Sequence, residues 1–259
     1  MHRCLIPTLI SLALLTGCAT SPTGRSQLVL MPESEMKQMG LQAFTNIKKE
    51  TPVDRDTNAN RYVDCVANAI TREVGGNWEV VVFKDDDANA FALPGGKIGV
   101  NTGLLKVAEN QDQLATVLGH EVAHVLSNHS NERVSQTFAV QQGLGLINAL
   151  ASPQSGTGQT VMGLLGVGAQ YGILMPYSRI QESEADLLGL DLMAKAGFNP
   201  QESTALWRNM ERAGGGQPPE FLSTHPSHGT RISSLRAHMP VALRLQQQAR
   251  ERGKRPACK

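Results

Sequence analysis

The chain has 259 residues, a formal net charge of +1 and 41% hydrophobic residues, which is enough for one domain with a substantial core. This balanced charge argues against nucleic acid as a partner, and the basic stretch at 244–259 is too short and isolated to change that. The sequence has no GxxxxGK[ST] loop, so we expect no use of ATP.

The N-terminal residues predict export and a lipid anchor. A short positive segment, Met1–Arg3, precedes an apolar stretch at Leu5–Leu15 that is too short to span a bilayer. The sequence Leu-Thr-Gly-Cys that ends at Cys18 resembles the lipobox, which is cut before a lipid-modified cysteine. We therefore expect a signal peptide at 1–17 and a lipidated tether at 18–30. Because alanine and not aspartate follows the cysteine, we expect anchoring in the outer membrane, facing the periplasm.

The cysteines predict one disulfide. Cys4 leaves with the signal peptide and Cys18 is lipidated, so Cys65 and Cys258 are the cysteines that remain in the mature chain. In an oxidising periplasm we expect these two thiols to be joined. The absence of a CxxC motif excludes a cysteine zinc site and thioredoxin-like chemistry.

Several segments have clear secondary-structure preferences. Trp78–Phe83 is β-branched and aromatic, which predicts a strand. Short apolar runs flank the turn signal Pro94–Gly96, which predicts two further strands at 91–93 and 97–100. Helices are expected at Ser34–Lys49, Asp64–Glu73 and Gln201–Arg212.

The central segment from Leu114 to Leu126 is almost entirely apolar, which predicts a buried helix. It nevertheless contains His120, Glu121 and His124, and such groups are costly to bury unless they are paired or bind a metal. The two histidines stand at i and i+4, so their rings project from one face, one turn apart. This HExxH pattern indicates two imidazoles that hold zinc, with the glutamate as a general base.

A catalytic zinc usually has three protein ligands and keeps a fourth position for water. The metzincin pattern is excluded, because Ser127 and Ser130 stand where it requires glycine and histidine. His129 follows His124 by five residues and is rotated off the ligand face. We expect His129 to be structural or to support a ligand, without binding the metal itself.

The segment at 139–175 is rich in glycine with apolar residues between, and a loop-like sequence at 151–158 divides it. Its apolar runs are too short to span a membrane. We expect two short helices that either gate the metal site or form a structural hairpin, with a membrane-dipping loop as the third alternative.

A later helix supplies an acidic ligand. Ser178 and Gln181 have the spacing of a capping box at its start, and Gly197 followed by Pro200 marks its end. The sequence between them contains Glu182-Ser-Glu184-Ala-Asp186.

Only one of the two glutamates in that helix can reach the metal, because Glu184 points roughly 160° away from Glu182. Glu182 and Asp186 share one face, so a Glu182 ligand leaves Asp186 to accept a hydrogen bond from a ligand imidazole. A Glu184 ligand would put Leu188 in that role, and leucine cannot accept. We therefore predict one zinc ion per chain, held by His120, His124 and Glu182.

HExxH followed by ExEAD on a later helix resembles the gluzincin metallopeptidases related to the CAAX prenyl protease, the heat-shock protease HtpX and the mitochondrial OMA-type proteases. Other segments fit the family too, at 89–105, 175–179 and 224–231. The likeness is greatest to periplasmic and outer-membrane lipoprotein members. It implies an α+β fold at 31–240, a mostly helical gluzincin-type metalloprotease domain with a small β-sheet packed over the HExxH helix, and a C-terminal tail at 241–259.

The resemblance also implies where substrate binds. In the family, the strand at Asn89, Ala90 and Phe91 lies at the sheet edge above the metal, where a substrate peptide adds as a further strand. From the residues alone, a plain hairpin of the core is an equally good interpretation.

The late segment Thr224-His225-Pro226-Ser227 matches another family motif. Gluzincins need a donor for the oxyanion that forms when water attacks. Pro226 keeps His225 out of helical conformation, which suits a side chain held over the zinc. We predict that His225 is either this catalytic donor or a latch on the open zinc position. The alternative is that it caps a helix that starts near Ser227.

These features together predict a lipid-anchored zinc endopeptidase of the bacterial envelope, in which Glu121 takes a proton from the attacking water. The family resemblance implies misfolded or stalled envelope polypeptides as substrates. The alternative from another class is a chaperone-like or binding module for outer-membrane protein assembly with a structural zinc. Glu121 argues against it, because a structural site needs no base. Metal storage is disfavoured, since one such site stores little.

Overall fold

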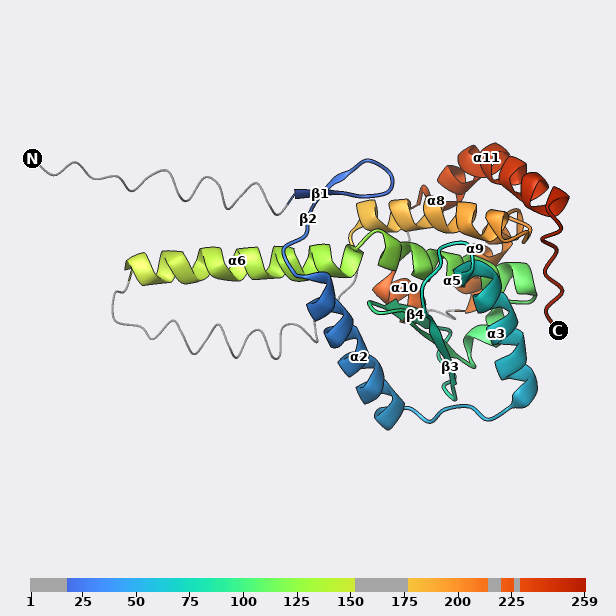
Figure 1. Ribbon diagram of the computed structural model, residues 1–259, viewed down its shortest axis with the longest axis horizontal. Coiled ribbons are helices and arrows are strands. Elements are labelled where there is room, and N and C mark those ends of the chain that lie inside the picture. The colour runs from blue at the N-terminus through green and yellow to red at the C-terminus, as the bar shows by residue number, and fades with distance from the viewer. Residues whose placement is uncertain (1–17, 152–176, 214–219, 226–228) are drawn as a thin grey trace, which may run out of the picture.

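The computed structural model describes residues 18–151, 177–213, 220–225 and 229–259 (Figure 1). It is mostly helical with small β-sheets, which confirms the predicted α+β class. Within these ranges, no helix combines the length and the apolar character needed to cross a membrane. The predicted signal peptide at 1–17 lies outside the described residues.

Helix α5 (Gln111–Leu126) carries the HExxH motif through the middle of the domain. It begins at Asn110, whose side chain accepts hydrogen bonds from the N–H groups of Asp112 and Gln113. From Gln113 to His124 every residue is buried. Other elements cover this helix on all sides, so its sequence is apolar nearly all round.

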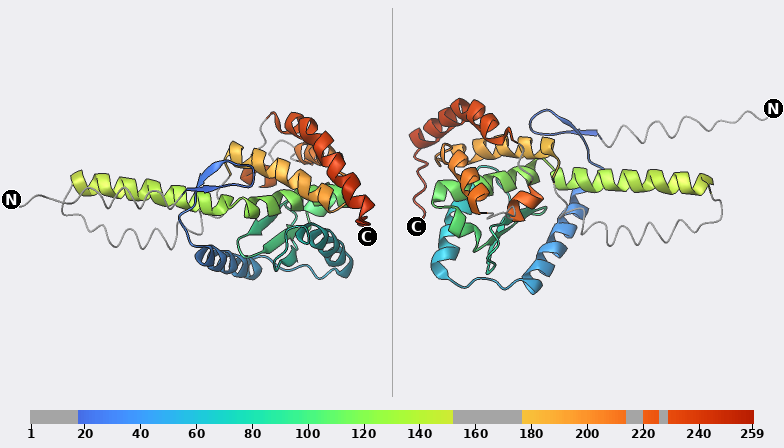
Figure 2. Two further views of the ribbon diagram at one scale, coloured as in Figure 1. Left: turned by 45° about the horizontal axis from the view of Figure 1, so that its top comes forward. Right: turned by 180° about the vertical axis from the view of Figure 1, so that it is seen from behind.

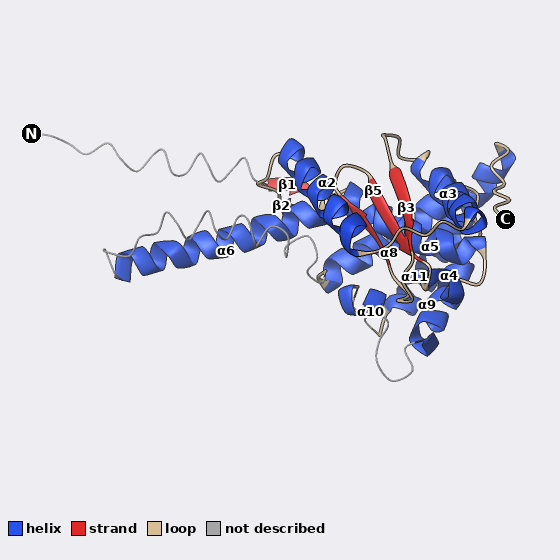
Figure 3. Cartoon of the chain, turned by 90° about the horizontal axis from the view of Figure 1, so that it is seen from below, coloured by secondary structure: helices blue, strands red, loops and turns tan. Residues whose placement is uncertain are grey.

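A three-stranded sheet packs on one side of α5, as predicted. Its strands are β3 (Glu79–Phe83), β4 (Ala90–Leu93) and β5 (Lys97–Asn101), in the spatial order β3-β5-β4 (Figure 3). β3 runs parallel to β5 and β4 runs antiparallel to it. The predicted turn between β4 and β5 is present, and the φ angles of 87° at Gly95 and 71° at Gly96 require glycine. β4 is therefore the edge strand that packs against α5.

Helices α2 (Glu33–Glu50) and α3 (Thr57–Thr71) flank the sheet. The helix predicted from Asp64 begins earlier, because the Asp56 carboxylate accepts hydrogen bonds from the first free N–H groups at its start. A short helix, α4 (Leu104–Val107), follows the sheet and leads into α5.

The other side of α5 is covered by helices. α8 (Arg179–Lys195) packs along α5, and α11 (Arg231–Glu251) packs on α8 (Figure 1). α9 (Glu202–Ala213) and α10 (Glu220–Thr224) complete this side. Both hydrogen bonds of the predicted capping box are present at the start of α8. α8 thus begins where the sequence indicates, which places its acidic residues beside the HExxH motif.

Two glycines let α5 and α8 approach closely. A Cβ atom on Gly119 would lie 2.7 Å from the carbonyl oxygen of Gly189, and one on Gly189 would lie 2.7 Å from the backbone nitrogen of His120. Any larger residue at either position would force the helices apart. The backbones of the two helices therefore meet at the first histidine of the motif.

Helix α6 (His129–Ala151) extends away from the body of the domain (Figures 1 and 2). It is continuous from His129, so the part of the 139–175 segment up to Ala151 belongs to one longer helix rather than to a separate short one. The rest of that segment lies outside the described residues.

The predicted tether at 18–30 differs from a free linker. Strands β1 (Cys18–Thr20) and β2 (Ser26–Leu28) form an antiparallel hairpin, in which Cys18 pairs with Leu28. The hairpin lies over the adjoining ends of α6 and α8 (Figure 1). The chain after it is held by α6, whose Asn131 side chain donates to the carbonyl of Met31 at 2.8 Å.

The C-terminal residues also belong to the fold. The predicted boundary at 240 falls inside α11, which continues to Glu251. Beyond it, Cys258 forms a disulfide with Cys65 of α3, with an S–S distance of 2.00 Å. The backbone N–H of Cys258 donates to the side chain of Gln111 at 2.8 Å. This end of the chain is thus fixed to the start of α5.

Candidate metal centre

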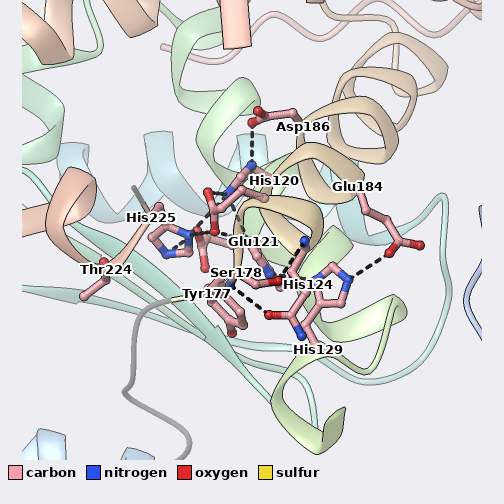
Figure 4. A network of polar contacts seen from close by, with 12 residues as sticks. His120, Glu121, His124, His129, Tyr177, Ser178, Glu184, Asp186, Thr224 and His225 are labelled. Atoms are coloured by element: carbon pink, nitrogen blue, oxygen red, sulfur yellow. Dashed lines mark hydrogen bonds and ion pairs between the residues drawn. The ribbon is translucent and has the colours of Figure 1, made fainter. Parts of the chain in front are cut away.

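The two histidines of the HExxH motif face one another inside the domain. His120 and His124 are each 1% exposed, and their Nε2 atoms lie 3.0 Å apart (Figure 4). This follows from their spacing of one helical turn on α5. Their Nε2 atoms form one side of the candidate metal centre.

Glu182 and His225 complete the cluster from other elements. Oε1 of Glu182, on α8, lies 3.4 Å from Nε2 of His124, and Oε2 lies 3.5 Å from Nε2 of His120. His225 follows α10, and its Nδ1 lies 3.0 Å from Oε1 of Glu182 and 3.2 Å from Nε2 of His120. The structure thus brings together all three predicted ligands and adds the predicted latch or donor.

This arrangement fits a tetrahedral zinc ion. The four ligand atoms lie within 4.8 Å of one another, and the distances given above run from 3.0 to 3.5 Å. Zinc bonds of about 2.0–2.1 Å imply tetrahedral edges of roughly 3.3 Å. The donor types, three imidazoles and one carboxylate, are also those that zinc prefers.

On the side that faces away from the ligand cluster, the His120 ring contacts a short series of charged groups. Its Nδ1 lies 3.0 Å from Oδ1 of Asp186, where the sequence predicts the acceptor (Figure 4). Arg231, on α11, donates to both carboxylates of α8, at 2.7 Å to Asp186 and 2.5 Å to Glu182. Its guanidinium also stacks over the ring of Trp207. Arg231 therefore holds the acidic side of the site in place, a role that its position at the end of the family segment at 224–231 did not specify.

The charges in this buried cluster shift one another's pKa values. Burial alone would lower the pKa of His120, but the carboxylates of Glu182 and Asp186 outweigh it and raise the pKa to about 9. Burial alone would raise the pKa of Glu182, but the charge of His120 and hydrogen bonds from three histidines hold it well below its usual range. The site therefore favours a bound positive charge.

His124 is supported by a different set of residues. Its Nδ1 lies 2.9 Å from Nδ1 of His129, and Nε2 of His129 lies 3.2 Å from Oε2 of Glu184 (Figure 4). Tyr177 stacks on the His124 ring with centroids 3.7 Å apart. His129 thus contacts a predicted ligand without joining the cluster, in agreement with its position off the ligand face. The only sequence signal for a place of Tyr177 near the site is its position in the family segment at 175–179.

Glu184 points away from the cluster, as its helical position predicts. It receives hydrogen bonds from Thr23 at 2.5 Å and from Nε of Arg25 at 3.0 Å, both in the turn of the β1–β2 hairpin. Burial would raise the pKa of Glu184, but hydrogen bonds from Ser21, Thr23, Arg25 and His129 lower it to about 2. Nothing in the sequence indicated that a residue of the expected tether reaches this network.

Glu121 lies beside the cluster without joining it. Its Oε2 accepts a hydrogen bond from the backbone N–H of Ala92 at 3.2 Å, and its Oε1 lies 3.4 Å from Nε2 of His225. Burial raises its pKa above the ordinary glutamate range. A buried carboxylate with a raised pKa, next to a metal centre, is suited to accept and return a proton at neutral pH.

The predicted substrate strand lies at this edge of the sheet. Asn101 donates from its N–H to the carbonyl of Asn89, so the alternate residues Ala90 and Ala92 direct their N–H and C=O groups away from β5. The side chain of Phe91 packs elsewhere, against Phe44 and Phe83.

The strand residues therefore have separate roles. Phe91 contributes its side chain to a second core cluster beneath α2, and Ala92, which the motif did not single out, provides an edge N–H that points to Glu121. Oδ1 of Asn89 is buried and has no hydrogen-bond partner among the described residues.

A buried HExxH helix, an acid from a second helix and an adjacent edge strand together define a zinc metallopeptidase domain of the gluzincin type. The comparison with known proteins agrees. The chain belongs to peptidase family M48, whose pattern it matches over residues 54–239.

The chain is similar in sequence to parts of longer proteins. The chain is 40% identical over 167 residues to the mitochondrial metalloendopeptidase OMA1 of Schizosaccharomyces pombe, covering 64% of this chain and 48% of the relative. It is 33% identical over 251 residues to the human metalloendopeptidase OMA1, covering 90% and 48%. It is 28% identical over 210 residues to the beta-barrel assembly-enhancing protease of Escherichia coli K12, covering 77% and 42%. The chain thus spans about half the length of these relatives.

Proposed function

We propose that this chain is a zinc endopeptidase that cuts polypeptides by attack of an activated water. The observation that carries the proposal is the buried ligand cluster of His120, His124 and Glu182 with the carboxylate of Glu121 beside it. A structural zinc site needs no free carboxylate at this position. When bound, zinc would lower the pKa of water toward about 7 and polarise the scissile carbonyl.

Proton transfer in this mechanism belongs to Glu121. Its Oε1 is buried, accepts no hydrogen bond from the described residues, and faces the same space as the ligand atoms. Glu121 would take a proton from the attacking water and deliver it to the leaving amine. The hydrogen bond from Ala92 holds its other oxygen and so fixes the direction in which the carboxylate points.

The substrate would bind as an added strand along β4. The outward N–H and C=O groups of Ala90 and the outward C=O group of Ala92 offer backbone hydrogen bonds, and the unpaired Oδ1 of Asn89 offers a further acceptor. A groove of about 830 Å³ begins beyond the end of β4, where the turn at 94–96, α2 and His124 line it. Backbone pairing tolerates many sequences, which suits unfolded polypeptides as substrates.

His225 would regulate or assist this reaction. Its Nδ1 lies among the ligand atoms, so it is placed to occupy the position that an attacking water needs, as a latch. A movement of this side chain would free that position and leave Nε2 as a donor to the oxyanion. The backbone N–H of His225 ends α10 by donating to Phe221 at 2.8 Å, so the movement would occur at the end of a short helix.

We further propose that the protein acts in the bacterial cell envelope, anchored to the outer membrane through a lipid on Cys18 and facing the periplasm. The lipobox-like sequence at 15–18 and the disulfide of Cys65 with Cys258 support an oxidising compartment outside the cytoplasm. As substrates we propose misfolded or stalled envelope proteins, since a bacterial relative is named for enhancing beta-barrel assembly.

The test is Glu121→Gln in the full chain, with hydrolysis of fluorescently labelled casein and bound zinc both measured. Loss of the general base should lower the rate by at least about 10²–10⁴-fold while zinc stays bound. Glu109→Gln, an exposed glutamate before the same helix, is the matched control and should retain full activity. Casein turnover near the wild-type rate in the Glu121 variant would refute the general-base role of Glu121. No casein hydrolysis by the zinc-bound wild-type chain would instead favour a chaperone-like role.

A further inference from the structure

The hairpin at 18–28 is joined to the centre of the domain by Arg25. The Nη1 and Nη2 atoms of this side chain donate to the two oxygens of Glu132 at 2.6 and 2.7 Å, and Nε donates to Glu184 at 3.0 Å. Glu132 and Glu184 are 4% and 5% exposed, on two different helices. Arg25 therefore neutralises two buried carboxylates that would otherwise repel each other.

These contacts continue without interruption to a metal ligand. Nε2 of His124 faces the other ligand atoms, so its Nδ1 carries the proton and donates to Nδ1 of His129. The proton of His129 is then on Nε2, from which it is donated to Glu184. Every donor in this series has one acceptor, and the last acceptor, Glu184, is held by Arg25 and Thr23.

We propose that Arg25 is a positioning residue of the metal centre, which acts through Glu184 and His129 to fix the ring orientation and tautomer of His124. This inference rests on the proposed function in one respect, that His124 binds zinc. It assigns a role to the N-terminal hairpin, which lies outside the stretch at 54–239 that matches the family.

The loss of zinc affinity should become smaller with each contact that separates the substituted residue from His124. Removing a direct hydrogen-bond partner of a ligand histidine usually costs about 10–100-fold in metal affinity, so His129→Ala should fall in that range. Arg25 acts two contacts further away, through Glu184 and His129, and we expect Arg25→Ala to weaken zinc binding by about 10-fold, the lower end of that range. Arg25→Lys keeps the positive charge but cannot contact Glu132 and Glu184 together as arginine does. Its zinc affinity should therefore lie between those of wild type and Arg25→Ala.

The experiment measures zinc affinity of the full chain by competition with a chelator, together with thermal unfolding of the zinc-free protein. Glu132→Gln is the matched control. It breaks the ion pair of Arg25 with Glu132, which has two hydrogen bonds, and leaves the contact of Arg25 with Glu184. We expect this control to change zinc affinity by no more than about twofold. A loss confined to Arg25→Ala would therefore assign the effect to Glu184.

A double-mutant cycle decides whether Arg25 acts through His129. If it does, Arg25→Ala should cause little further loss of zinc affinity in a His129→Ala background. Fully additive losses would overturn the inference. So would wild-type zinc affinity in Arg25→Ala with a lower unfolding temperature, since the hairpin would then only stabilise the fold. If the wild-type chain itself binds no zinc, the proposed function fails and the inference fails with it.

Discussion

The two histidines of the HExxH motif look equivalent in sequence, yet they are supported in different ways. His120 is backed by Asp186 and Arg231, which are 5% and 2% exposed and belong to two packed helices. His124 is backed by His129 and Glu184, and this series ends at the partly exposed Arg25 of the N-terminal hairpin. One ligand is therefore fixed by buried residues of the core, and the other depends on a partly exposed residue of the N-terminal hairpin.

The largest effect on zinc binding should come from the loss of Glu182, the acidic ligand that contacts both histidines. Glu182→Ala removes a ligand and leaves the buried guanidinium of Arg231 without one of its partners, so the purified protein should contain almost no zinc. Glu184→Ala should retain zinc on purification and lose it to a chelator more readily than wild type. Metal analysis that gave the reverse order would overturn the assignment of Glu182 as the ligand.

Single substitutions can test the support of His120 by Asp186 and that of His124 by His129 separately. Asp186→Ala and His129→Ala should each weaken zinc binding by about 10–100-fold. Asp186→Ala should also lower the stability of the zinc-free protein by about 1–3 kcal/mol or more, because it leaves the charged Nε of buried Arg231 unpaired. Chelator competition and urea unfolding measure the two effects.

A third substitution is the control for Asp186→Ala and His129→Ala. His238→Ala removes a similar contact, at 2.8 Å from Asp191, between the same helices α8 and α11 but away from the ligands. It should leave zinc affinity unchanged. Equal zinc loss in all three variants would mean that neither support is specific.

His225→Ala should change turnover without lowering zinc content, since three ligands remain. If His225 is a donor, the casein rate should fall by about 10²–10³-fold. If it is a latch, the rate should rise. Steady-state rates with parallel zinc analysis distinguish these outcomes, and an unchanged rate with full zinc would leave only a structural role for the residue at the end of α10.

The smallest effect on the metal centre is expected from the disulfide. Cys65→Ser with Cys258→Ser opens a bridge between residues 193 apart in sequence, so the free energy of unfolding should fall by about 4–5 kcal/mol. Neither cysteine contacts the supports of His120 or His124, so zinc affinity should be retained. Two reactive thiols in the denatured, non-reduced wild-type protein would contradict the pairing.

Much of the site follows from helical periodicity. One-turn spacing places His120 with His124 and Glu182 with Asp186, and it turns Glu184 away, because a single helix fixes all these directions. The capping box marks the start of α8 for the same local reason. The fold class, the family and the sheet with its turn were predictable because their signals lie within short, continuous stretches.

The other features depend on contacts between distant segments. Arg25 looks like a solvated residue in a linker, and only docking of the hairpin on α6 and α8 gives it two carboxylates. The continuity of α6 across Gly143 and Gly145 is likewise not a local preference, since glycine disfavours helix. Gly119 and Gly189 each look unremarkable alone, and their meaning appears only where two helices cross.

That crossing has a consequence for how firmly the protein can hold its ion. Because backbone meets backbone at Gly119 and Gly189, α5 and α8 can come no closer there, and these are the helices that carry His120, His124 and Glu182. An alanine at Gly189 would place a methyl group 2.7 Å from the backbone nitrogen of His120, force the two helices apart and so weaken zinc binding.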